Sequence, residues 1–189
     1  MVVIKKKYYL IIESIKNINL ENIKKRDKFN IIYRNQLKPE KKEDLLKFRK
    51  FCKIKSIDFF VANDLNLARK LHADGIYLSS YNKSFKPLLF KKSKFHIIGS
   101  AHSSKEIHMK IKQGCEIIFF SKLFLVSYDK KSPFLGVIRF NKLLHHNQNL
   151  VPLGGINLKN LNHLQMIKSY GFALMSELKK KPAIIRRLF

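Results

Sequence analysis

The sequence predicts an α/β protein folded as a single (β/α)8 TIM barrel, compact and with short loops, and three observations support this. Eight apolar segments rich in β-forming residues recur at fairly regular intervals. Several are continuous hydrophobic runs, which are typical of strands buried on both faces of a parallel sheet. Segments with helical spacing lie between them, as in the alternation of a barrel. A doubly wound open sheet is the alternative, but the even count of eight and a closing helix over residues 182–189 favour the barrel.

The expected strands are short and apolar. In chain order they span residues 8–12, 30–34, 58–62, 75–79, 95–101, 115–121, 150–155 and 172–176. The third and fourth give the clearest signal, because the third ends in Asn63-Asp64, a helix over 65–72 follows, and Gly75 begins the next strand. This is one βαβ step with a carboxylate at the carboxyl end of its first strand, where parallel α/β folds place their chemistry.

Three further helices have recognisable signals. The segment 43–51 opens with carboxylates, which suit a helix N-terminus, and places apolar side chains near one face. Residues 103–106 have the Ser-x-x-Glu form of a capping box and precede an apolar stripe. Residues 161–167 carry a similar stripe before Gly171. Each segment lies between two expected strands, as the barrel requires.

Length and composition limit the number of domains and the class of protein. At 189 residues and 46% hydrophobic content, residues 1–189 are expected to form one domain with one core. Cys52 and Cys115 lie in no zinc-binding spacing and are expected to be buried thiols in a reducing compartment. The N-terminal apolar run is too short for a signal peptide, and no run approaches the roughly 20 residues that span a bilayer. A cytoplasmic protein with no membrane contact is therefore expected.

The formal net charge of +26 raises the question of nucleic-acid binding. A concentrated Lys/Arg surface binds phosphates by releasing counterions. The 39 basic residues are instead spread from Lys5 to Arg187, as single lysines or short clusters without an Arg-rich stripe. We therefore expect no dedicated nucleic-acid site, but a basic surface whose field attracts small anions.

Candidate functional residues follow from the barrel itself, because only the carboxyl ends of its strands and the loops after them face an active site. The rule selects Arg34, Asn63, Asp64, residues 79–82, Ser100, His102, residues 121–131, Gly154, Gly155, Met175 and Ser176.

The loops after the seventh and eighth strands form a natural phosphate pocket, since glycines let backbone N–H groups approach an anion there. Asp64 could hold Mg²⁺ through its oxygens, or it could cap the helix that begins at Leu65. His102 could be a general acid or base, because imidazole side chains titrate near neutral pH, or it could cap the helix that follows.

Several short motifs occur in a fixed order along nearly the whole chain. The most specific block combines Asn63-Asp64, Leu67-Ala68 and Ala-Asp-Gly-Ile-Tyr-Leu over 73–78. The others are Tyr9-Leu10-Ile11, Tyr33-Arg34, Gly-Ser-Ala-His-Ser over 99–103, Gly-Cys-Glu over 114–116, Gly136 and Gly-Gly-Ile over 154–156. In this order and spacing the sequence resembles the thiamine phosphate synthase/TenI family of small (β/α)8 barrels.

The resemblance implies a transferase of thiamine biosynthesis, which joins a hydroxymethylpyrimidine diphosphate to a thiazole phosphate and releases pyrophosphate. Mg²⁺ is the implied cofactor, because a metal and cationic groups stabilise the departing pyrophosphate. By resemblance, Arg34, Asn63 and Asp64 serve the diphosphate and metal, Ser100 serves the pyrimidine, and Gly155 with Ser176 serves the thiazole phosphate.

Several positions depart from the family pattern. Ile32 stands where the family has Gln, and Asn82 stands at the second metal-binding Asp. The loop over 121–130 lacks two phosphate-gripping Thr residues, so that Lys130 or Lys131 would supply the cation. Two alternatives stay open: a TenI-like thiazole tautomerase in which His102 transfers a proton without metal, and a non-catalytic barrel that binds a thiamine-related phosphate or a protein partner.

Overall fold

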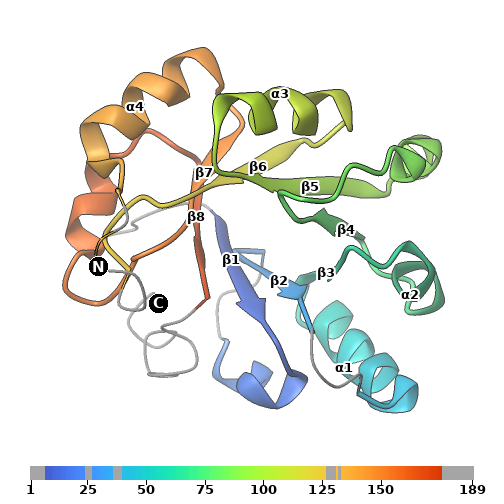
Figure 1. Cartoon of the computed structure of the whole chain (residues 1–189). Coiled ribbons are helices and arrows are strands. Elements are labelled where there is room, and N and C mark those ends of the chain that lie inside the picture. The colour runs from blue at the N-terminus through green and yellow to red at the C-terminus, as the bar shows by residue number, and fades with distance from the viewer. Residues whose placement is uncertain (1–6, 24–26, 36–39, 127–130, 132, 176–189) are drawn as a thin grey trace.

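The computed structural model describes residues 7–23, 27–35, 40–126, 131 and 133–175, and its eight parallel strands form a nearly closed barrel (Figure 1). The strands are β1 (Lys7–Ile12), β2 (Phe29–Tyr33), β3 (Asp58–Ala62), β4 (Gly75–Leu78), β5 (His96–Ala101), β6 (Ile117–Phe120), β7 (Leu150–Pro152) and β8 (Gly171–Leu174). All eight lie within a few residues of their predicted positions, and the predicted barrel is confirmed.

The strand order brings the candidate residues to one rim. Each strand pairs in parallel with its neighbours in the sequence, and β1 also pairs with β8, which gives the order β7-β6-β5-β4-β3-β2-β1-β8. β7 and β8 contact each other but share no hydrogen-bonded ladder. Because all strands run in the same direction, their carboxyl ends and the loops that follow them meet at the same end of the barrel.

The inside of the barrel is filled by one layer of side chains that receives a contribution from every strand. Its buried members are Tyr9, Ile11, Ile32, Phe60, Tyr77, Ile98, Phe119, Val151 and Ala173. The Tyr9 and Phe119 rings meet edge to face with centroids 4.9 Å apart, and the centroid of the Tyr77 ring lies 5.9 Å from that of Phe119. Aromatic contacts of this kind close the space in which a pore would otherwise run.

Alternate residues of the strands face outward into a second, larger core beneath the helices. In the part of the chain that the structure describes, four α-helices cover it: α1 (Lys42–Ile54) after β2, α2 (Leu65–Lys70) after β3, α3 (Ser104–Lys112) after β5 and α4 (Gly136–His146) after β6. α1 buries Leu45 and Cys52, as its predicted apolar face requires. No helix among the described residues is long and apolar enough to cross a membrane.

The prediction of an α-helix after every strand is wrong in three places. Two short 3-10 helices, η1 (Ile15–Asn17) and η2 (Leu20–Asn22), follow β1, while η3 (Lys86–Ser93) follows β4 and η4 (Leu161–Met166) follows β7. In the first of these loops, Ser14 and Asn19 accept hydrogen bonds from backbone N–H groups two residues on, which competes with a longer helix. The closing helix predicted over 182–189 lies outside the described residues.

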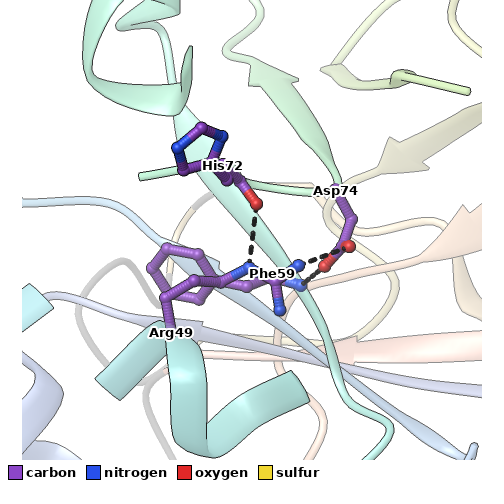
Figure 2. A network of polar contacts seen from close by, with 4 residues as sticks. All are labelled: Arg49, Phe59, His72 and Asp74. Atoms are coloured by element: carbon purple, nitrogen blue, oxygen red, sulfur yellow. Dashed lines mark hydrogen bonds and ion pairs between the residues drawn. The ribbon is translucent and has the colours of Figure 1, made fainter. Parts of the chain in front are cut away.

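An ion pair at the opposite rim ties α1 to β3 and to the start of β4 (Figure 2). Arg49 of α1 donates to Asp74 Oδ1 at 2.7 Å and to the His72 carbonyl oxygen at 3.1 Å. The second oxygen of Asp74 accepts from the Phe59 N–H at 2.7 Å. Asp74, part of the most specific sequence block, therefore has a structural role.

Replacing Asp74 with Ala should lower the free energy of unfolding by about 2–3 kcal/mol, because a charged donor and a backbone N–H both lose their acceptor. Urea denaturation measures the change. The control is Glu116→Ala, which breaks the exposed pair between Glu116 and His96 near the same rim and should cost less than about 1 kcal/mol. Equal losses in the two variants would contradict the assignment.

The thiol of Cys52 should make stability depend on alkaline pH. Burial raises its pKa from 9.0 to about 12, so the folded chain keeps a proton that the unfolded chain loses above pH 9.0. The stability from this group is complete below pH 9.0 and is lost as pH rises toward the folded pKa, by at most about 1.4 kcal/mol per pH unit. Between about pH 8 and about pH 10.5, Cys52→Ala should lose stability less steeply than the wild type in urea titrations, and identical slopes would refute this.

Candidate active site

Arg34 enters the mouth of the barrel directly after β2. Its backbone N–H donates to the Ile12 carbonyl oxygen at 2.8 Å, which extends the pairing of β1 with β2 by one residue. Its Nη1 lies 4.0 Å from the sulfur of Met175, just after β8. Its Nε is buried and has no hydrogen-bond partner among the described residues. A buried guanidinium N–H without an acceptor is costly, and an anion in this space would satisfy it.

Below Arg34, Ser100 and Tyr77 join the site to the interior layer. Both side chains are buried and form a hydrogen bond with each other. Burial raises the pKa of Tyr77, while Ser100 and the positive charge of Arg34 partly oppose this rise. The structure therefore brings the predicted residues Arg34, Ser100 and Met175 together around Tyr77.

Asn63 organises the loop that follows β4. Its backbone has φ of +61°, a left-handed conformation that Asn tolerates better than most residues. Its side-chain amide donates to Ser79 Oγ at 2.8 Å and to the Tyr81 hydroxyl at 3.0 Å. Its Oδ1 accepts from the Ser79 N–H at 2.9 Å and from the Asn82 amide at 3.1 Å. The side chain of Asn63 thus holds the loops after β3 and β4 together.

The same loop is supported from behind by the fully buried Lys110 of α3. Its Nζ donates to the carbonyl oxygens of Ser79 and Asn82 at 2.7 and 2.8 Å and to Gln113 Oε1 at 2.9 Å. The Gln113 amide in turn donates to the carbonyl oxygens of Asn82 and Ser84. Removal from water lowers the pKa of Lys110, and the three oxygens compensate its charge with hydrogen bonds.

The two predicted metal ligands are engaged within the protein. Asp64 caps α2, since its Oδ1 accepts from the Leu67 N–H at 2.8 Å, while its Oδ2 has no hydrogen-bond partner among the described residues. The Asn82 amide nitrogen donates to Asn63, and its Oδ1 accepts from the Ser84 N–H at 2.9 Å. Within the described part of the chain, no three His, Cys, Asp or Glu side chains gather as a metal site.

His102 lies exposed just after β5. Its ring Nδ1 is 2.8 Å from the hydroxyl of Ser121, the first residue after β6. Its backbone N–H donates to Glu106 Oε2 at 2.7 Å, and Ser103 Oγ caps α3 by accepting from the Glu106 N–H. The predicted Ser103 cap is confirmed, but the Glu106 carboxylate accepts from the His102 N–H and not from the Ser103 N–H of a capping box. These bonds fix the backbone of His102 and leave its ring free to contact Ser121.

The predicted glycine pair forms a turn after β7. Gly154 and Gly155 have φ of +91° and +71°. A Cβ on Gly155 would lie 2.3 Å from the Phe124 carbonyl oxygen, so no larger residue fits without a backbone shift. Among the described residues, the N–H groups of Gly154 and Gly155 have no hydrogen-bond partner, which leaves them available to an anion.

Not every predicted residue joins one site. Lys130 and Ser176 lie outside the described residues. The described contacts form three groups. The first contains Arg34 with Met175 above the pair Ser100 and Tyr77, the second contains Asn63 and Asn82, and the third contains His102 with Ser121 beside Gly154. None of these contacts joins Asp64 to another predicted residue.

The sequence prediction missed two supporting residues, Lys110 and Gln113, and it selected Ser121 only as the first residue of the loop over 121–131. A signal existed for Lys110, which stands three residues after the buried Ile107 and therefore on the buried face of α3. Nothing in the local sequence marks the pairing of Ser121 with His102, because it depends on two adjacent strand ends.

Comparison with known proteins gives consistent matches. The family model for thiamine monophosphate synthase matches residues 9–178. A thiamine-phosphate synthase of Flavobacterium johnsoniae is 28% identical over 148 residues, 72% of this chain and 70% of that protein. One of Lactococcus lactis is 29% identical over 155 residues, 80% of this chain and 70% of that protein. The structure of thiamine phosphate pyrophosphorylase from Pyrococcus furiosus superimposes with a TM-score of 0.69 at 16% identity, covering 97% of each chain.

Replacing Lys110 with Met should lower the free energy of unfolding by about 2–4 kcal/mol, because buried oxygens of Ser79 and Gln113 lose their donor. Thermal and urea denaturation measure the change. Lys112→Met is the matched control, since Lys112 lies on the same helix but is exposed, and it should change stability by less than about 0.5 kcal/mol. A Lys110 variant as stable as the control would contradict a supporting role.

Proposed function

Because this chain belongs to the thiamine monophosphate synthase family, we propose that it joins a hydroxymethylpyrimidine diphosphate to a thiazole phosphate with release of pyrophosphate. Its role is thiamine phosphate synthase-like and lies in thiamine biosynthesis. Both substrates carry phosphate groups, so the reaction needs groups that bind anions at the carboxyl rim of the barrel.

The observation that carries this proposal is the buried Nε of Arg34 at the mouth of the barrel, for which the described residues provide no acceptor. A diphosphate oxygen in this space would accept from the guanidinium and neutralise its charge. The Tyr77 ring lies in the layer beneath and Ser100 binds its hydroxyl, so a planar pyrimidine would rest on this floor. The positive field of the whole chain favours the approach of both anionic substrates.

The glycine turn after β7 supports binding of the second substrate. The N–H groups of Gly154 and Gly155 would donate to the thiazole phosphate, together with Ser176. In this arrangement the thiazole phosphate occupies the side of the rim next to β7 and β8, and the diphosphate occupies the side next to β2.

The residues present fit Mg²⁺ in a limited way. Asp64 Oδ2 is a carboxylate oxygen that no described residue contacts with a hydrogen bond, and Mg²⁺ commonly uses one carboxylate together with substrate phosphates. Asn82 would contribute only if its Oδ1 left the Ser84 N–H. When bound, the metal would stabilise the negative charge of the departing pyrophosphate. The protein's own contribution is to hold the guanidinium of Arg34 next to that charge.

Purified protein should release pyrophosphate from the two substrates in the presence of Mg²⁺, in step with formation of thiamine phosphate. Arg34→Met should lower kcat by about 100-fold or more, because it removes the cation that faces the leaving group. Arg139→Met replaces an exposed arginine of α4 and should leave the rate unchanged. No release above a control without enzyme, at several protein concentrations, would remove the synthase proposal.

The contact between His102 and Ser121 favours a second candidate, a TenI-like tautomerase of a thiazole carboxylate phosphate. This proton transfer needs a base near the substrate and no metal. If the wild type isomerises that substrate without Mg²⁺, His102→Ala should abolish the reaction while circular dichroism shows the fold intact. Unchanged rates in this variant would exclude the role. Ligand binding with neither activity would leave the non-catalytic barrel.

A further inference from the structure

The side chain of Asn63 determines which way the hydrogen bonds run at the edge of the loop after β4. A backbone N–H can only donate, so the Ser79 N–H at 2.9 Å must meet the oxygen of the Asn63 amide. The amide nitrogen of Asn63 therefore faces the hydroxyls of Ser79 and Tyr81, at 2.8 and 3.0 Å. An amide nitrogen can only donate, so both hydroxyl oxygens accept, and each hydroxyl keeps its own proton for another partner.

Several acceptor oxygens of the same loop are already used within the protein. Asn63 Oδ1 also accepts from the Asn82 amide, and Asn82 Oδ1 accepts from the Ser84 N–H. The carbonyl oxygens of Ser79 and Asn82 accept from the Lys110 ammonium group. With these oxygens occupied, the loop has hydroxyl protons rather than oxygen lone pairs to offer a ligand.

The charge of the loop suits a ligand that accepts hydrogen bonds. Residues 79–86 contain two lysines and no Asp or Glu. The buried ammonium group of Lys110 adds a positive charge behind them. Protons and cations together favour an anionic oxygen, since hydrogen bonds to ionised acceptors are stronger than those to neutral ones.

Tyr81 carries the exposed one of the two hydroxyl protons. Its side chain is 65% exposed, and its hydroxyl lies on the same Asn63 amide as Ser79. Ser79 stands two residues after the inward-facing Tyr77 and therefore faces the mouth of the barrel. An ionised Tyr81 would raise the pKa of Tyr77 and Arg34 lowers it, so both side chains lie near this one hydroxyl. The Tyr81 proton has no acceptor among the described residues.

We propose that Tyr81 is a substrate-binding residue whose hydroxyl donates its proton to an anionic oxygen of a diphosphate that Arg34 also contacts. The identity of the ligand as a diphosphate rests on the proposed function. Asn63 is the positioning residue, because its amide holds the phenolic oxygen and leaves the proton to the ligand. The family pattern has a metal-binding Asp at position 82, whereas this chain contacts the diphosphate from the β4 side by a direct hydrogen bond.

Binding of inorganic pyrophosphate to the purified protein tests the proposal without turnover. Isothermal titration calorimetry in EDTA, at fixed ionic strength, should show binding to the wild type. Tyr81→Phe should weaken this binding about tenfold or more, because a hydrogen bond to a charged oxygen is lost. Tyr170→Phe is the matched control, since Tyr170 is also exposed but precedes β8 at the opposite rim, and it should leave the affinity unchanged.

A second variant separates donation to the ligand from support of Asn63. O-methyltyrosine in place of Tyr81 keeps an oxygen that accepts from the Asn63 amide but has no proton to donate. It should bind pyrophosphate as weakly as Tyr81→Phe does, and urea denaturation verifies that each variant is folded. Wild-type affinity in either variant would overturn the proposal, as would absence of pyrophosphate binding to the wild type.

Turnover distinguishes failure of this inference from failure of the proposed function. If the wild type releases pyrophosphate, Tyr81→Phe should lower kcat/KM for the pyrimidine diphosphate about tenfold and leave KM for the thiazole phosphate nearly constant. An unchanged kcat/KM would overturn the role of Tyr81 while the synthase proposal stands. If no pyrophosphate is released but its binding depends on Tyr81, the synthase proposal is removed and the role of Tyr81 stands.

Discussion

The buried ammonium group of Lys110 is the constraint on which the β4 side of the rim depends. A cation without a carboxylate partner is stable inside a protein only if oxygen atoms surround it, and here backbone carbonyls of residues 79 and 82 are among those oxygens. The hydrogen bonds from the Lys110 ammonium group to these carbonyl oxygens consequently hold the loop after β4 in place. Asn63 forms hydrogen bonds with Ser79 and Asn82 of this loop. The positions of these polar side chains at the rim therefore depend on the Lys110 charge buried behind them.

The interactions that stabilise the barrel and the residues of the candidate site lie at opposite ends of the strands. At one rim, Arg49 and Asp74 connect a helix to two strands through well-formed hydrogen bonds. In the middle, a layer with aromatic rings at its centre closes the interior. At the other rim, an arginine Nε and the glycine N–H groups have no protein acceptor among the described residues. Donors without a protein acceptor are what a site for anions requires, and the Arg49–Asp74 contacts at the other rim add rigidity to the barrel that carries them.

The sequence was sufficient to predict the eight strands, because each is a compact apolar run whose burial on two faces leaves a plain signal. The helices were less predictable, since Ser14 and Asn19 decide between a 3-10 turn and an α-helix through single side-chain hydrogen bonds. At the site, positions after strand ends such as Arg34 followed from topology. The burial of Lys110 could have been read from its spacing to Ile107, but its oxygen partners after β4 and the contact of Ser121 with His102 depend on packing between elements that no local pattern encodes.

The barrel is open to deformation between β7 and β8, because these two strands share no ladder of backbone hydrogen bonds. Seven of the eight junctions are joined by ladders of backbone hydrogen bonds, whereas β7 and β8 lie next to each other without such a ladder among the described residues. The glycine turn follows one of these two strands and Met175 follows the other. The distance between the loops after β7 and β8 can therefore change without breaking any ladder hydrogen bond. A ligand that contacts both loops would join these two strands and so complete the closure of the barrel.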